Sequence, residues 1–233
     1  VDNAAICAVL QRIWSSPRFH VQCTGGDFSL PSAEKQRMHA DIGSRHRIGD
    51  YFAFHDPMHP GRGYCDLPAP VVKVYVAMVD FNEENGPPLF VPGSHWRFSQ
   101  EDVPEEDPPG SRRAFCPQGS AIVMDMRVWH HGTPNRSEGA RPMLSVHYAG
   151  PWYSEEVLRS GSTHWQYHKG ALTREAFESL RPRARELCKH LAPPTPEECC
   201  AQCGRASARS GQAAAAPKQT WYCRRCWAEW TGP

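Results

Sequence analysis

Hydrophobic and polar positions alternate along parts of the chain, and this alternation predicts β-strands. The stretch 71–80, VVKVYVAMVD, places every second apolar side chain on one face of an extended chain. The stretch 121–148 contains two further alternating segments, separated by residues 132–140, which are rich in glycine, proline, asparagine and serine. We therefore expect a core strand at 71–80 and a β-hairpin with a long turn at 121–148.

Parity along the predicted hairpin assigns its side chains to two faces. The inward face of the first strand consists of Ile122, Met124, Met126, Val128 and His130. The neighbouring His131 falls on the polar face. On the return strand, Arg141 shares a face with Met143, Ser145 and His147. A histidine and an arginine are thus expected to enter one interior.

Other elements follow from helical spacing and from turn residues. Ala4–Trp14 carries a helical apolar stripe, and Thr173–Leu191 predicts a second helix that begins at a Thr173 cap and is kinked or split by Pro182. His20–Cys23 predicts a short strand that ends at the turn residues Gly25–Asp27. Short strands in a chain with 22 prolines and 18 glycines favour a mainly β sandwich or barrel with flanking helices.

Four of the ten cysteines form two CxxC pairs near the C-terminus. Cys200, Cys203, Cys223 and Cys226 have the spacing of a structural tetrathiolate zinc site, although Cys199 could replace Cys200. Pro193–Pro196 reads as a linker, which predicts a first domain at 1–192 and a linker with a small zinc-ribbon-like module at 193–233. Metal-binding cysteines favour a reducing compartment, so we expect an intracellular, cytoplasmic protein.

Charge and hydropathy exclude some classes of function. A net charge of +1 gives no field that would attract nucleic acid, and no apolar run approaches the length of a membrane span. The chain starts at Val1, which suggests a truncated or processed product. The remaining expectation for partners is a small-molecule substrate, together with a protein partner bound through the zinc module.

Candidate chemistry begins with an H-x-D pair. In an extended chain His39 and Asp41 project the same way. With His130 on the other side of the interior, they would form the two-histidine, one-carboxylate triad of non-haem Fe(II) oxygenases, which leaves three metal positions open. His95 follows a tight turn and ranks below His130 as the third ligand. Taken alone, each residue also fits a purely structural role: His130 as a histidine at the rim of the core, and His39 with Asp41 as an ion pair at a turn.

Arg141 suggests the co-substrate. An Fe(II) oxygenase that splits O2 needs two further electrons, which 2-oxoglutarate supplies by oxidative decarboxylation. Its far carboxylate suits a planar two-pronged cation such as Arg141, and Ser145 on the same face could add a hydroxyl. Lys73 or Tyr75 could also border this cavity, but parity does not say which face of 71–80 looks inward. His46, His55 and His59 fit a solvated loop better than a second metal cluster.

Three motifs in order resemble the phytanoyl-CoA dioxygenase family over about residues 19–150. They are Gln36-x2-His39-x-Asp41, the run 80–95 (DFNEENGPPLFVPGSH), and the run 129–137 (WHHGTPNRS) followed by Arg141. The resemblance implies a double-stranded β-helix (jelly roll), iron bound by His39, Asp41 and His130, 2-oxoglutarate bound by Arg141, and Gln36 near the co-substrate. Several members carry serine where this chain has Gly132, and the CxxC module is not part of the family pattern.

The resulting prediction is an Fe(II)- and 2-oxoglutarate-dependent dioxygenase that hydroxylates a small or lipid-like organic substrate. Halogenating relatives replace the metal carboxylate with a small residue, so Asp41 favours hydroxylation. Two alternatives stay open. One is a catalytically silent jelly-roll scaffold that recruits a partner through its zinc module; the other is a cupin-like metalloenzyme that does not use 2-oxoglutarate. Fold analogy does not select the substrate.

Overall fold

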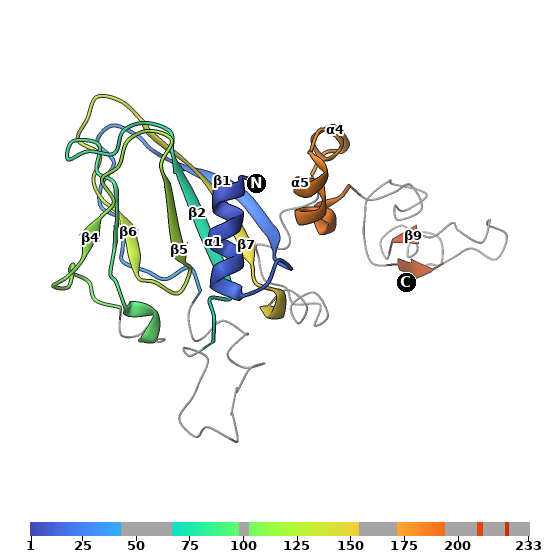
Figure 1. Ribbon diagram of the computed structural model, residues 1–233. Coiled ribbons are helices and arrows are strands. Elements are labelled where there is room, and N and C mark those ends of the chain that lie inside the picture. Colours follow the sequence, from blue (N-terminus) through green and yellow to red (C-terminus); the bar gives the residue numbers. More distant parts are fainter. Residues whose placement is uncertain (43–66, 98–102, 154–171, 194–208, 212–221, 224–233) are drawn as a thin grey trace, which may run out of the picture. The chain divides into compact units, whose positions relative to one another are not determined.

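A computed structural model describes residues 1–42, 67–97, 103–153, 172–193, 209–211 and 222–223 (Figure 1). The chain divides into two compact units, Val1–Lys169 and Gly170–Pro233. This division falls earlier than the boundary expected after residue 192, and the predicted domain roles stay predictions. Among the described residues, no helix has the length and apolar character needed to cross a membrane.

The first unit is built from two antiparallel sheets, as the predicted mainly β class requires (Figure 1). The larger sheet has the strand order β1 (His20–Ser29), β7 (Arg141–Ala149), β2 (Val71–Ala77), β5 (Ala121–Asp125). The smaller sheet has the order β4 (Arg112–Arg113), β3 (Pro88–Phe90), β6 (His130–Gly132). All strand pairs in both sheets are antiparallel.

The two sheets face each other across an apolar core. Tyr75 on β2 and Phe90 on β3 approach with ring centroids 6.4 Å apart, and Phe90 stacks on His130 of β6 at 6.1 Å. Tyr75 and Phe90 pack in one apolar cluster with buried side chains of the larger sheet: Val71, Ala77, Met124, Met143 and Ala149. The interior is therefore the place where side chains of both sheets meet.

Strand register decides which face of β2 looks inward. Lys73 lies opposite Met124 on β5 and opposite His147 on β7. Tyr75 lies opposite Ser145, two residues further along β7 in the direction of Arg141. Lys73 and Tyr75 are thus on the interior face, which resolves the choice that parity left open.

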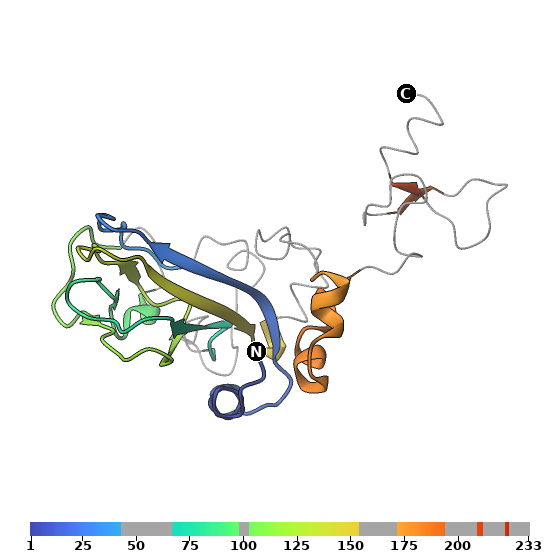
Figure 2. The ribbon, with the colours of Figure 1, turned by 90° about the horizontal axis from the view of Figure 1, so that it is seen from above.

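Helix α1 (Ala4–Trp14) forms as the apolar stripe predicts and runs alongside the larger sheet (Figures 1 and 2). Asn3 caps it by accepting hydrogen bonds from the main-chain N–H groups of residues 5 and 6, at 3.0 and 3.2 Å. Trp14 fixes the other end by donating its indole N–H to the carbonyl of Ala69 at 2.6 Å. A Cβ at Gly150 would lie 2.6 Å from that indole nitrogen, so this contact requires glycine there.

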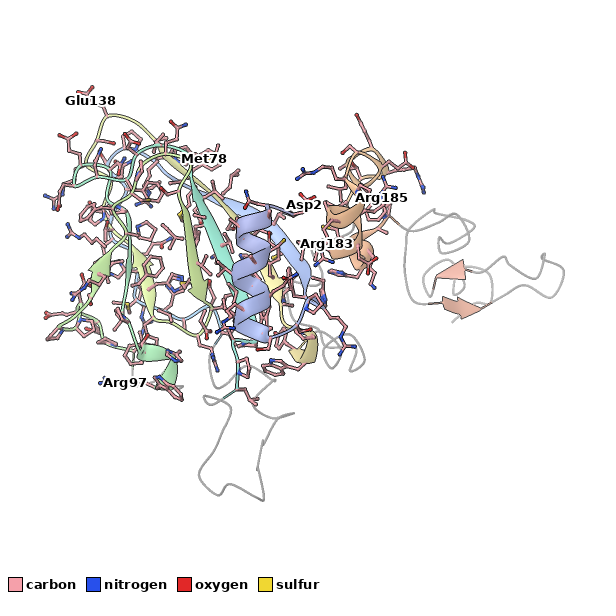
Figure 3. All side chains as sticks on the ribbon, in the orientation of Figure 1. Asp2, Met78, Arg97, Glu138, Arg183 and Arg185 are labelled. Carbon is pink, nitrogen blue, oxygen red and sulfur yellow. The ribbon has the colours of Figure 1, made fainter. Side chains whose placement is uncertain are left out.

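The hairpin expected at 121–148 does not form. The first strand stops at Asp125, whose carboxylate accepts hydrogen bonds from the main-chain N–H and the guanidinium of Arg127, and a turn follows at 126–129. The chain then crosses to the smaller sheet as β6, so β6 and β7 pair with different strands. Glu138 lies at the outer tip of the connection between them (Figure 3).

The strand expected at His20–Cys23 is longer than predicted. β1 continues to Ser29 through Gly25 and Gly26, which do not turn but pair with Ser145 and Leu144 of β7. A Cβ at Gly26 would lie 2.9 Å from the carbonyl oxygen of Met143. Glycine here permits a close approach of two strands rather than a change of direction.

In the second unit the predicted helix is split at proline, as expected. α4 (Arg174–Glu178) starts at Thr173, which accepts from the N–H of residue 176 at 3.1 Å, and α5 (Pro182–Leu187) starts at Pro182. The 3-10 helix η5 (Lys189–Leu191) follows, and β8 (Arg209–Gly211) pairs with β9 (Tyr222–Cys223). The side chains of the four predicted zinc ligands lie outside the described residues, as do His46, His55 and His59.

Candidate metal and co-substrate site

His39 and His130 face each other directly across an antiparallel bridge. Each donates its main-chain N–H to the carbonyl of the other, at 3.0 and 2.8 Å. Their imidazole centroids lie 4.5 Å apart. The expectation that His39 reaches His130 from the other side of the interior is therefore wrong, because the two histidines sit on adjacent extended segments.

Main-chain carbonyls fix the orientation and tautomer of both rings. His39 Nδ1 lies 2.9 Å from the carbonyl oxygen of Arg37, and His130 Nδ1 lies 2.9 Å from that of Val128. A carbonyl can only accept, so each Nδ1 carries a hydrogen, and in the neutral form of either ring the lone pair lies on Nε2. Outer hydrogen bonds of this kind orient metal-ligating histidines.

Asp41 completes the cluster. Its Oδ1 lies 3.6 Å from His39 Nε2, and its Oδ2 lies 3.6 Å from His130 Nε2. One ligand atom from each residue can be chosen so that all three lie within 4.8 Å of one another. Atoms this close suit a single ion held by bonds of about 2 Å. His95, in the 3-10 helix η2 (Ser94–Trp96), is not in this cluster and lies instead beside Trp96, with ring centroids 4.8 Å apart and the planes tilted by 41°.

The protonation states match those that a metal ion requires. Burial lowers the pKa of His130 to about 4, although the Asp41 carboxylate opposes this shift. Burial alone would raise the pKa of Asp41, but the charges of His130 and Lys73 outweigh it, so the pKa lies below its usual range. At neutral pH the site thus offers a neutral imidazole and an ionised carboxylate, and binding an ion needs no proton release from either.

Lys73 enters the site from β2. Its Nζ donates to Asp41 Oδ2 at 3.1 Å and lies 4.7 Å from the centre of the Tyr75 ring. The Lys73 side chain is 12% exposed, so its stem is enclosed by the core. Burial raises the pKa of Tyr75 to about 12, which keeps the phenol neutral. The alternation along β2 places Lys73 and Tyr75 on one face, and this alternation was the feature of the sequence that marked both as residues that could border the cavity.

Arg141 is the first residue of β7 and is 4% exposed. One guanidinium nitrogen lies 3.4 Å from the carbonyl oxygen of Asn85, and the guanidinium carbon lies 5.8 Å from the centre of the Phe81 ring. Its Nε is buried without a hydrogen-bond partner among the described residues. A buried cationic donor that lacks a partner is costly, so this group suits an anionic ligand.

Asn85 connects the run 80–95 with this site, because its main-chain carbonyl contacts Arg141. Its side chain donates to the carbonyl of Asp80 at 2.6 Å and accepts from the N–H of Asn82 at 3.0 Å. These bonds close the turn whose Asn85 carbonyl contacts Arg141. The asparagine therefore positions its own main chain rather than a ligand.

One cavity of about 390 Å³ connects the metal cluster with Arg141. Its volume is within the range of small-molecule sites. The described residues that line it include His39, Asp41, His130, Arg141, Gln36, Lys73 and Tyr75. Ser145 lies on the interior face, opposite Tyr75 and buried, but is not among these lining residues. Asp27 and Thr133 also line the cavity and were not singled out from the sequence.

Gln36 and Gly132 form a matched pair at the cavity wall. The main-chain N–H of Gly132 donates to Gln36 Oε1 at 2.9 Å, and the N–H of Gln36 donates to the Gly132 carbonyl at 3.0 Å. A Cβ at Gly132 would lie 2.9 Å from Gln36 Oε1. Glycine at this position thus makes room for the glutamine, whose side-chain N–H groups stay available to the cavity.

His131 differs from its predicted place on a polar face, because it is buried. Its side chain is 1% exposed, and its Nε2 lies 2.8 Å from Asp107 Oδ1. Lys35 donates to the same carboxylate oxygen at 2.7 Å. Asp107 thus links His131 of β6 to Lys35, which lies in the segment that leads to the proposed metal ligands His39 and Asp41.

Comparison with known proteins gives one family and several relatives. The sequence model of the phytanoyl-CoA dioxygenase family (PhyH) matches residues 1–143. "Dioxygenase af480" of Aspergillus fumigatus is 31% identical over 127 residues, which are 52% of this chain and 38% of that protein. "Dioxygenase olcK" of Penicillium canescens is 34% identical over 95 residues, which are 39% of this chain and 30% of that protein. The matched part thus spans well under half the length of these relatives.

Solved structures with a similar chain trace include ThoJ and HygX. The nickel complex of the non-haem monooxygenase ThoJ has a TM-score of 0.46 at 19% identity and covers 64% of this chain and 51% of its own. HygX from Streptomyces hygroscopicus, with nickel and 2-oxoglutarate bound, has a TM-score of 0.45 at 20% identity and covers 64% of each chain.

Proposed function

The chain belongs to the phytanoyl-CoA dioxygenase family, and we propose that it is an Fe(II)- and 2-oxoglutarate-dependent dioxygenase that hydroxylates a small or lipid-like organic substrate. Members of this family are Fe(II)- and 2-oxoglutarate-dependent oxygenases. The observation that carries the proposal is the single cavity lined both by the His39, Asp41 and His130 cluster and by Arg141. We also infer that the two facing sheets are the halves of a double-stranded β-helix.

The proposed iron ligands are His39 Nε2, a carboxylate oxygen of Asp41, and His130 Nε2. Two imidazoles and one carboxylate are the donor set of non-haem Fe(II) oxygenases. The Nδ1 hydrogen bonds of both histidines hold the rings with Nε2 towards Asp41, so the chain prepares the site before an ion arrives. Three protein ligands leave positions for a co-substrate and for O2.

Arg141 is the proposed anchor for the far carboxylate of 2-oxoglutarate. Arg141 is buried and lines the same cavity as the metal ligands, and its Nε has no hydrogen-bond partner in the part of the chain that the structure describes. A guanidinium binds a carboxylate with two parallel hydrogen bonds, which a lysine ammonium does not provide. The side-chain N–H groups of Gln36 have no hydrogen-bond partner among the described residues and are proposed to add a contact along the cavity wall. The role predicted for Ser145 stays a prediction.

When bound, iron and 2-oxoglutarate supply O2 activation and the two electrons it needs, with 2-oxoglutarate converted to succinate and CO2. The residues of the chain provide orientation and exclude water. Arg141 fixes one end of the co-substrate, and Tyr75 and Met143, which belong to the apolar core, line the same cavity. Charged groups act more strongly in such a low-dielectric site than in water.

Calorimetric titration of 2-oxoglutarate into the Mn(II)-loaded protein tests this proposal. Mn(II) stands in for Fe(II) without being oxidised. We expect measurable binding by the wild type and an affinity about 10- to 100-fold lower in Arg141→Met, because a charge-assisted hydrogen bond contributes about 1.5–3 kcal/mol. Arg112→Met, which changes an exposed arginine of β4, serves as a matched control and should bind normally.

Two outcomes would contradict the proposal. Failure of the wild type to bind Mn(II) or 2-oxoglutarate would favour the silent scaffold. Equal 2-oxoglutarate affinity in the wild type and Arg141→Met would favour the metalloenzyme that does not use this co-substrate.

A further inference from the structure

Lys73, which contacts the carboxylate of the proposed metal ligand Asp41, lies on a strand in the interior of the larger sheet. It belongs to β2, which pairs with β5 on one side and β7 on the other. Its direct cross-strand neighbours are Met124 and His147, both buried. The position of the ammonium is thus set by the centre of the larger sheet, whereas Asp41 belongs to a segment outside both sheets.

The two oxygens of Asp41 have different surroundings. Both oxygens lie 3.6 Å from a histidine Nε2, and Oδ2, which is the one near His130, also accepts the hydrogen bond from Lys73 at 3.1 Å. Oδ1 lies 3.6 Å from His39 Nε2 and accepts no hydrogen bond from the described residues. Among the described residues, Lys73 thus donates to one oxygen of Asp41, and the other oxygen accepts no hydrogen bond.

This difference matters because a carboxylate can bind a metal ion through one oxygen or two. An octahedral ion has six positions. If Asp41 gives one oxygen, the triad takes three positions, a chelating 2-oxoglutarate takes two, and one remains for O2. If Asp41 gives both oxygens, no position remains for O2.

We propose that Lys73 is a positioning residue that keeps Asp41 a one-oxygen ligand and so preserves the metal position at which O2 binds. This inference rests on the proposed function. The donor is an ammonium held at hydrogen-bond distance from Oδ2 and shielded from water by its burial. To turn both oxygens to the metal, Asp41 would have to give up this charge-assisted bond in a poorly solvated place.

A different role for Lys73 would be simple charge balance. A cation beside the site weakens metal binding, so its removal would tighten binding of the ion but would not change how many ligands Asp41 provides. A purely structural role would change the midpoint of thermal unfolding. Neither role changes the number of water molecules on a bound ion, and that number is the discriminating measurement.

The test uses Mn(II) as the probe and the relaxation rate of water protons as the readout, with every chain saturated with the ion. In the wild type we expect three exchangeable waters on the bound ion, and one after addition of 2-oxoglutarate. In Lys73→Met, whose unbranched side chain has a similar length, we expect the enhancement to fall by about a third without 2-oxoglutarate and to vanish with it. Lys73→Arg keeps a donor and should behave like the wild type.

Unchanged water numbers in Lys73→Met would overturn the inference. If Lys73→Met did not fold, Lys73→Arg would decide the question: wild-type water numbers support the inference, and a lost water contradicts it. Failure of the wild type to bind Mn(II) or 2-oxoglutarate would instead refute the proposed function, so the two failures are distinguishable.

Discussion

Each proposed histidine ligand is oriented by its own main chain. His39 and His130 both donate from Nδ1 to the carbonyl two residues earlier. In an extended segment, positions two residues apart project to the same side, so this contact follows from the local backbone. No distant side chain is needed to set the tautomer of either ring. The orientation of the two imidazoles should therefore survive changes elsewhere in the cavity.

The depressed pKa of His130 predicts how the metal-free protein responds to acid. The unfolded chain takes up this proton near the ordinary histidine pKa of about 6.5, whereas the folded protein does so only near 4. The contribution of His130 is therefore complete above pH 6.5 and is lost as the pH falls towards 4, by up to about 3 kcal/mol. Urea unfolding of the metal-free wild type and of His130→Asn across this range measures the effect. Equal slopes in the two proteins would contradict it.

Gly86 is expected to be irreplaceable. Its φ is +65°, and a Cβ there would lie 1.9 Å from the carbonyl oxygen of Pro134. Gly86→Ala should cost about 3 kcal/mol or more, from backbone strain and from overlap with that carbonyl. Gly93→Ala is the matched control: φ is +81° but nothing lies within 4 Å, so only strain of about 1 kcal/mol is expected. Thermal unfolding of both variants checks this difference.

The residues of the site were predictable to different degrees. Two histidines, an aspartate and an arginine at these spacings indicate one chemistry, so the sequence alone singled out His39, Asp41, His130 and Arg141. The structure brings these four residues to one cavity. Lys73 could not be assigned, because both faces of β2 contain buried residues and alternation alone does not mark an interior. Asp107 was missed because its partner His131 is distant in sequence and was expected on a polar face.

At the scale of elements, local hydrogen bonds ended a strand that the apolar pattern would have continued. The alternation of residues 122–130 runs through Asp125 without interruption. The carboxylate of Asp125, however, binds the N–H and guanidinium of Arg127 and stops the strand there. His130 still points inward because it starts a strand in the other sheet. The correct face was thus reached from the wrong pairing.

The contact between Asp107 and His131 of β6 gives a prediction at the scale of elements. Asp107→Ala removes the hydrogen-bond partner of Nε2 of the buried His131 and should destabilise the protein by about 1–3 kcal/mol. Lys35→Ala removes the other partner of Asp107, but Lys35 and Asp107 are 37% and 35% exposed, so a loss of less than about 1 kcal/mol is expected. Chemical denaturation of both variants measures the difference. A larger loss in Lys35→Ala than in Asp107→Ala would contradict this order.

At the scale of the whole molecule, the residues of the proposed site all belong to the unit Val1–Lys169, and the CxxC pairs belong to Gly170–Pro233. The spacing of Cys200, Cys203, Cys223 and Cys226 still predicts a closed structural zinc site. Metal analysis of the purified chain should find one zinc, and the double variant Cys223→Ser/Cys226→Ser should lose it. Binding of Mn(II) and 2-oxoglutarate should be unchanged in that variant, because the two metal sites share no ligand.

The mainly β class was predictable because alternation and turn residues are local signals. The division of the strands between two sheets was not, because it depends on pairings between residues far apart in sequence, such as Ser29 with Arg141 in the larger sheet. Those pairings also build the site.

The most direct test of the central claim is formation of succinate from 2-oxoglutarate under air, measured by mass spectrometry with and without Fe(II), for the wild type and for His130→Ala. The proposed site predicts slow succinate formation by the wild type even without the substrate, only when Fe(II) is present. It also predicts that His130→Ala, which lacks one iron ligand, forms none above the protein-free background. Succinate formation at the wild-type rate by His130→Ala, or none by the Fe(II)-loaded wild type, would contradict it.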